Sequence, residues 1–85
     1  MRKEVEWFAE KMEEKLKRDD ESKSHWLKTS YGYLFCRLGE EIEELQELLD
    51  DDNVSYKHKK IIKECADIAN FAMMIADKAK NGSIY

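Results

Sequence analysis

Apolar residues recur every three or four positions in three stretches of the chain, residues 5–16, 31–49 and 61–79. This spacing places the apolar side chains of each stretch on one face of a helix. With three glycines and no proline among 85 residues, the chain also lacks the turn residues that β-hairpins need. We therefore predict an all-α fold of three helices and a single domain over residues 1–85.

Polar stretches separate the predicted helices. The first helix is expected from about Arg2 to Lys17, and the polar residues 18–24 end it. The second begins near Trp26 or Ser30 and continues to about Leu49. Residues 50–55, Asp-Asp-Asp-Asn-Val-Ser, combine helix-stop with N-cap chemistry, so the third helix should start there. Asn81-Gly82 offers the left-handed residue that commonly ends a helix.

The apolar faces predict how the helices pack. The face of the first helix consists of Val5, Phe8, Met12 and Leu16; that of the second of Tyr31, Leu34, Leu38, Ile42, Leu45 and Leu49; that of the third of Ile61, Cys65, Ile68, Ala72, Ile75 and Ala79. We expect the second and third helices to form an antiparallel hairpin that turns near residues 52–55, with the first packed on it or on a partner. Since so short a chain buries only about 60% of its unfolded surface, we also expect a homodimer or homotetramer that completes a four-helix-bundle-like core.

Composition excludes several classes of function. A net charge of -4 argues against binding of a nucleic-acid polymer, which needs a basic face. No apolar run approaches the roughly 18 residues of a membrane span, and no signal-peptide core follows the charged amino terminus, so we expect a cytoplasmic protein. Cys36 and Cys65 form no C-x-x-C pair and are expected to be reduced and structural.

Four carboxylates carry the strongest functional signal. On a helical wheel, Glu41 and Glu44 lie on one flank of the second apolar face, and Glu64 and Asp67 lie at matching angles beside the third. In an antiparallel hairpin these flanks meet, and the mean of the four positions, 54, falls in the predicted turn. The pattern therefore predicts four converging carboxylates beside the core. By its angle Glu47 should face away from them.

Converging carboxylates repel one another unless a cation binds them. Ligation by oxygen alone favours Mg²⁺, with Mn²⁺ as an alternative, and Mg²⁺ often takes further ligands from substrate phosphates. Arg37 and Lys60 lie on the same flank and could hold phosphate oxygens, as could Lys63 and Lys78. Phe71 continues this flank and could pack against a base.

Simpler interpretations exist for each of these residues. An acidic string is often only a solvated helix face. Arg37 and Lys60 could form ordinary ion pairs within their helices, Phe71 could be a packing residue, and Trp26 could anchor the core.

The string Leu38-Gly39-Glu40-Glu41-Ile42-Glu43-Glu44-Leu45, followed after nineteen residues by Glu64-Cys65-Ala66-Asp67, resembles the E-E-x-x-E and E-x-x-D signature of the MazG-like all-α nucleoside triphosphate pyrophosphohydrolases. The resemblance implies Mg²⁺-dependent cleavage of a (deoxy)nucleoside triphosphate to the monophosphate and pyrophosphate. It implies metal ligation by Glu41, Glu44, Glu64 and Asp67 and catalytic roles for Glu40, which would orient water, and Glu44. Trp26, Asn70 and Phe71 are candidates to face a base whose identity stays open.

Two other functions stay open at this point. The first is a non-catalytic helical module whose apolar faces serve dimerisation. The second is a nucleotide sensor that keeps the metal site without hydrolysis.

Overall fold

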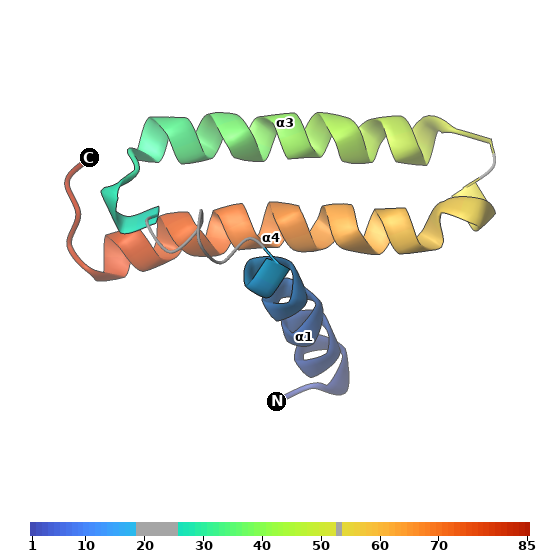
Figure 1. Cartoon of the computed structure of the whole chain (residues 1–85), viewed down its shortest axis with the longest axis horizontal. Coiled ribbons are helices and arrows are strands. Elements are labelled where there is room, and N and C mark those ends of the chain that lie inside the picture. The colour runs from blue at the N-terminus through green and yellow to red at the C-terminus, as the bar shows by residue number, and fades with distance from the viewer. Residues whose placement is uncertain (19–25, 53) are drawn as a thin grey trace.

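The structure, a computed structural model, describes residues 1–18, 26–52 and 54–85 (Figure 1). In these residues the chain forms three α-helices and two short 3-10 helices, and no strand. The α-helices are α1 (Lys3–Arg18), α3 (Tyr31–Asp50) and α4 (His58–Lys80), and the 3-10 helices are η1 (Trp26–Lys28) and η2 (Val54–Lys57). The all-α prediction is confirmed. The predicted loop over residues 18–24 lies outside the described residues, except for Arg18, which ends α1.

Two of the predicted helix ends follow from local chemistry. Ser30 caps α3, because its Oγ accepts a hydrogen bond from the backbone N–H of Tyr33 at 3.1 Å. Of the two predicted starting points the chain therefore uses Ser30, and Trp26 lies in η1. At the carboxyl-terminal end of the hairpin, α4 ends at Lys80 and Gly82 adopts the predicted left-handed backbone with φ of 76°.

The start of α4 differs from the prediction. No side chain caps its first turn, and the residue at the N-cap position is Lys57. The 3-10 helix η2 precedes it, so the α-helix begins only at His58. The Lys57 ammonium instead pairs with the carboxylate of Asp51 at the end of α3. The turn is thus closed by an ion pair between the two helices rather than by a cap.

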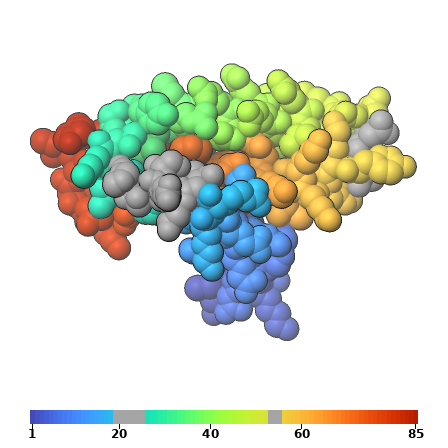
Figure 2. Space-filling model, in the orientation of Figure 1, coloured from blue at the N-terminus to red at the C-terminus, as the bar shows by residue number. Residues whose placement is uncertain are grey.

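The helices α3 and α4 run antiparallel, side by side, as predicted, and α1 crosses α4 and projects from the pair (Figures 1 and 2). The amide of Asn70 joins α1 to α4 by donating to the carbonyl oxygen of Met12 at 3.1 Å. Leu16 packs against the core, whereas Val5 is exposed. Of the predicted face of α1, Phe8, Met12 and Leu16 are therefore half-buried, and Val5 is left in solvent.

The packed face of α4 is rotated from the predicted one. The core is formed by Leu34, Phe71 and Met74, while Ala72 and Ala79, which the periodicity assigned to the core, are exposed. This part of the prediction is wrong because α4 is contacted by α3, α1 and η1 on adjoining sides, and the larger Phe71 and Met74 bury more apolar surface than two alanines. The rotation brings the carboxylate flank into the interface between the helices.

The packed side of α3 also differs from the predicted one, since Glu41 is buried while Ile42 and Leu49, which the periodicity assigned to the packed face, are exposed. Phe35 is 68% exposed, Ile42 48% and Leu49 52%. These three residues, spaced by seven, form what we call the exposed apolar face. No described helix is long and apolar enough to cross a membrane.

Candidate functional site

Three carboxylates meet midway along the hairpin. Glu41 of α3 and Glu64 and Asp67 of α4 each offer an oxygen atom, and these atoms lie within 4.8 Å of one another. Glu64 and Asp67 share a flank because they are three residues apart on one helix, and the antiparallel packing brings Glu41 opposite them. Glu41 is only 7% exposed, so the cluster reaches into the helix interface.

Glu64 has the most perturbed environment of the three. Burial, and then its closeness to Glu41 and Glu44, raise the pKa of Glu64 to about 9. One of its oxygens, Oε1, is buried and has no hydrogen-bond partner among the described residues. A buried oxygen without a donor is unfavourable, so this position suits a cation or a proton.

Two basic side chains offset part of the negative charge. Lys15 of α1 forms an ion pair with Asp67, Nζ to Oδ2 at 3.1 Å, and both side chains are less than one-fifth exposed. Arg37 donates from Nη2 to Glu41 at 3.2 Å and also pairs with Glu40. These carboxylates, Glu40 above all, raise the pKa of the guanidinium of Arg37. Glu64 thus lies between two carboxylates that already have cationic partners.

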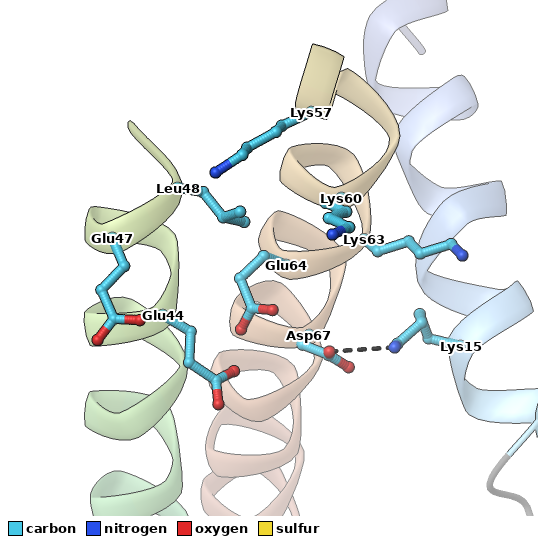
Figure 3. A pocket seen from close by; sticks show the side chains of 9 residues that line it. All are labelled: Lys15, Glu44, Glu47, Leu48, Lys57, Lys60, Lys63, Glu64 and Asp67. Carbon is cyan, nitrogen blue, oxygen red and sulfur yellow. Dashed lines mark ion pairs between the residues drawn. The ribbon is translucent and has the colours of Figure 1, made fainter. Parts of the chain in front are cut away.

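A pocket of about 430 Å³ opens beside the cluster towards the turn of the hairpin (Figure 3). Its walls combine carboxylates with four lysines, and we call it the lysine pocket. It is lined by Lys15, Glu44, Glu47, Leu48, Lys57, Lys60, Lys63, Glu64 and Asp67. Lysines on three elements can hold several anionic oxygens at once, which suits a polyphosphate.

A second pocket, of about 220 Å³, lies on the other side of the cluster along the hairpin. It is lined by Trp26, Thr29, Tyr33, Leu34, Arg37, Phe71 and Met74, and we call it the aromatic pocket. The guanidinium of Arg37 lies over the ring of Phe71, 5.4 Å from its centroid. Flat apolar walls beside one cation suit an aromatic ring with polar edges, such as a nucleobase.

The structure separates the predicted site residues into three groups. Glu41, Glu64 and Asp67 form the cluster, and Glu44 lies next to it in the lysine pocket with Lys60. The aromatic pocket takes in Trp26, Arg37 and Phe71.

Glu40 and Asn70 lie apart from these groups. Glu40 is exposed and pairs with Arg37. Asn70 is fully buried between α1 and α4, so its side chain lines neither pocket.

Some placements correct the sequence interpretation. Glu47 does not face away, because it lines the lysine pocket. Lys78, a candidate for the phosphates, is fully buried at the far end of α4. The simpler interpretations of Arg37 as an intrahelical ion-pair partner and of Trp26 as a core anchor both describe contacts that exist, since Trp26 packs against the core.

Lys15 belongs to the candidate site but is not predicted from the sequence. It lies one turn after Met12 on α1, in a run of alternating Glu and Lys that resembles any solvated helix. Its approach to Asp67 depends on where α1 crosses α4, and no local pattern in the sequence carries that information.

The donor set fits a divalent cation. Its ligands would be carboxylate oxygens alone, as Mg²⁺ and Mn²⁺ prefer, and Oε1 of Glu64 has no hydrogen-bond partner within the described part of the chain. A scan of family models and searches of curated proteins and of solved structures found no match to this chain.

Proposed function

We propose that the protein is a divalent-cation-dependent nucleoside triphosphate pyrophosphohydrolase, which converts a (deoxy)nucleoside triphosphate and water into the monophosphate and pyrophosphate. The order of features along the hairpin carries the proposal: aromatic pocket, carboxylate cluster, lysine pocket. A nucleotide has the same order of base, α-phosphate and terminal phosphates. With the base in the aromatic pocket, the carboxylates would lie beside the α-phosphate.

The spacing along α3 agrees with the size of such a substrate. Arg37, Glu41 and Glu44 follow one another by four and three residues on one flank. At about 1.5 Å per residue, Arg37 and Glu44 are about 10 Å apart along the helix axis. A nucleotide laid along the hairpin would therefore reach from the aromatic pocket past the cluster to the lysines.

Glu41, Glu64 and Asp67 are the proposed ligands of Mg²⁺, with Glu44 completing the set. A bound Mg²⁺ would offset the charge of the phosphates and polarise the phosphorus–oxygen bonds. Its presence would also favour the ionised form of Glu64, whose pKa is raised to about 9 in the protein alone.

The remaining groups bind and orient the substrate. Lys57, Lys60 and Lys63 hold the β- and γ-phosphates. Glu44 also serves as the base: its oxygen that does not ligate the cation takes a proton of the water that attacks the α-phosphorus, the bond to the bridging oxygen breaks, and pyrophosphate leaves towards the lysines. Glu40, held by Arg37 on the solvent side, could orient this water only if the pair with Arg37 opened.

The test is a panel of the common NTPs and dNTPs with Mg²⁺, assayed separately for pyrophosphate and orthophosphate. We expect pyrophosphate from at least one of them and none after Asp67→Asn. Orthophosphate as the first product would assign the protein to another class of hydrolase. Binding of a nucleotide without turnover would favour the sensor instead.

We also propose that a second copy of the chain covers the exposed apolar face and completes a four-helix bundle. Phe35, Ile42 and Leu49 follow the seven-residue spacing of helices that pair along their length. The neighbouring Gly39 has open space where a side chain would lie, so a second backbone can approach closely. The same face would serve the alternative, a non-catalytic dimerisation module, and the product assay separates the two functions.

A further inference from the structure

A buried lysine at the far end of the hairpin has no role in the proposed chemistry. Lys78 is fully buried, and no carboxylate of the described chain forms an ion pair with it. An isolated buried charge is strongly unfavourable unless other polar groups replace its water. The surroundings of Lys78 therefore need an explanation.

Four groups from two segments surround the ammonium. Nζ donates to the carbonyl oxygen of Leu27 at 3.3 Å and to Oγ of Ser83 at 3.1 Å. It also lies over the rings of Tyr31, at 4.9 Å, and Tyr85, at 5.4 Å. Two carbonyl or hydroxyl oxygens and two aromatic faces form a cage that stabilises a cation without a counter-ion.

The cage joins segments that are far apart in the sequence. Leu27 belongs to η1 and Tyr31 to the start of α3, whereas Ser83 and Tyr85 follow α4. Tyr31 strengthens this junction by donating from its hydroxyl to the carbonyl oxygen of Ser83 at 3.0 Å and from its backbone N–H to that of Tyr85 at 2.6 Å. The carboxyl-terminal end of the chain lies beside the start of α3 in Figures 1 and 2.

The segment held by Lys78 forms one wall of the aromatic pocket. Trp26, which precedes Leu27 in η1, and Thr29, which follows η1, both line that pocket. The indole of Trp26 is itself held from α4, since Nε1 donates to Oδ2 of Asp77 at 3.0 Å. Two adjacent residues of α4 thus bind η1: Asp77 accepts from the side chain of Trp26, and Lys78 donates to the backbone of Leu27.

We propose that Lys78 is a positioning residue for the aromatic pocket: its caged ammonium holds η1 so that Trp26 and Thr29 form the wall against which the base packs. The consequence for nucleotide binding rests on the proposed function. The consequence for Trp26 does not, because it concerns only the folded protein.

The test uses the fluorescence of Trp26 in a Trp7→Phe background, where it is the sole tryptophan. Lys78→Met keeps the length of the side chain and removes the ammonium. We expect helix content by circular dichroism to be retained while acrylamide quenching of Trp26 rises towards that of the exposed Trp7, measured in Trp26→Phe. Lys59→Met, which removes an exposed lysine at the opposite end of α4, is the control and should leave quenching unchanged.

In the active enzyme, Lys78→Met should raise KM for the triphosphate about tenfold, the scale of one lost base-stacking contact, with kcat little changed. Its Mg²⁺-induced shift in Tm should match that of the wild type, because the carboxylates lie elsewhere on the hairpin. If no triphosphate is hydrolysed, the quenching experiment still decides the role of Lys78.

Unchanged quenching in a folded Lys78→Met protein would overturn the proposal, as would increased quenching with an unchanged KM. If that variant fails to fold, Tyr85→Leu removes one face of the cage and leaves the lysine in place. Increased quenching in Tyr85→Leu then supports the proposal, and unchanged quenching overturns it.

Discussion

The pKa of Glu64 is strongly raised by burial and by the neighbouring carboxylates of the site. Because this pKa is about 9 in the folded protein, against an ordinary value of 4.5, Glu64 keeps its proton at neutral pH. Glu64→Gln mimics that protonated form without the penalty. We expect it to raise the melting temperature of the metal-free protein and to abolish the Mg²⁺-induced increase in Tm that arises when a ligand binds only the folded state. Glu43→Gln, an exposed change on α3, is the control and should alter neither value. An equal Mg²⁺ shift in all three proteins would contradict the carboxylate site.

The same residue predicts how stability depends on pH. An acid whose pKa is higher in the folded state binds its proton more tightly there, so its contribution favours folding at low pH. That contribution is complete below about 4.5 and is lost as the pH rises through about 9. The free energy of unfolding of the metal-free wild type should therefore fall relative to that of Glu64→Gln across this range, as urea titrations at several pH values can measure. Parallel curves for the two proteins would show that Glu64 is not perturbed.

Lys15 neutralises the cluster from a different helix. Because its ion pair with Asp67 is largely buried, Lys15→Met should destabilise the metal-free protein by about 1 to 3 kcal/mol through loss of this charge-assisted hydrogen bond. Mg²⁺ should restore part of this loss, so its effect on Tm should be larger than in the wild type. Lys11→Met, on a more exposed pair with Glu14, should cost less than about 1 kcal/mol.

At the scale of the element, α3 depends on its first turn. The hydroxyl of Ser30 satisfies the N–H of Tyr33, and Ser30→Ala should lower the free energy of unfolding by about 1 kcal/mol. Ser30→Asp keeps an acceptor in place and adds a favourable charge at the helix amino terminus, so it should leave stability unchanged or higher. Equal losses in both variants, measured by denaturant unfolding, would mean that the cap hydrogen bond contributes nothing.

At the scale of the whole molecule, the exposed apolar face should set the oligomeric state. Ile42→Glu places a charge at the centre of that face and should convert a dimer into a monomer, as light scattering measures. Tyr56→Glu, which replaces an even more exposed large side chain outside the face, should leave the dimer intact. A wild-type protein that is monomeric at micromolar concentration would contradict the proposed second copy.

The sequence by itself determined the three helices, the antiparallel pairing of two of them and three of the four acidic residues predicted to meet, while Glu44 lies beside the cluster. Those features depend on local spacing and on one turn midway between residues 41–44 and 64–67, so periodicity predicts them. The left-handed Gly82 and the cap at Ser30 are equally local.

Only the tertiary structure decided how each helix is rotated about its axis. That rotation follows from the balance of contacts that α4 makes with α3, α1 and η1, and it buries Phe71 and Met74 while leaving Ala72 exposed. The orientation of α3 likewise buries Glu41 in the interface, and the crossing of α1 over α4 brings Lys15 to Asp67. Such contacts join residues far apart in the chain, and their energies depend on the packing of all three partners at once, which no spacing within a single helix encodes.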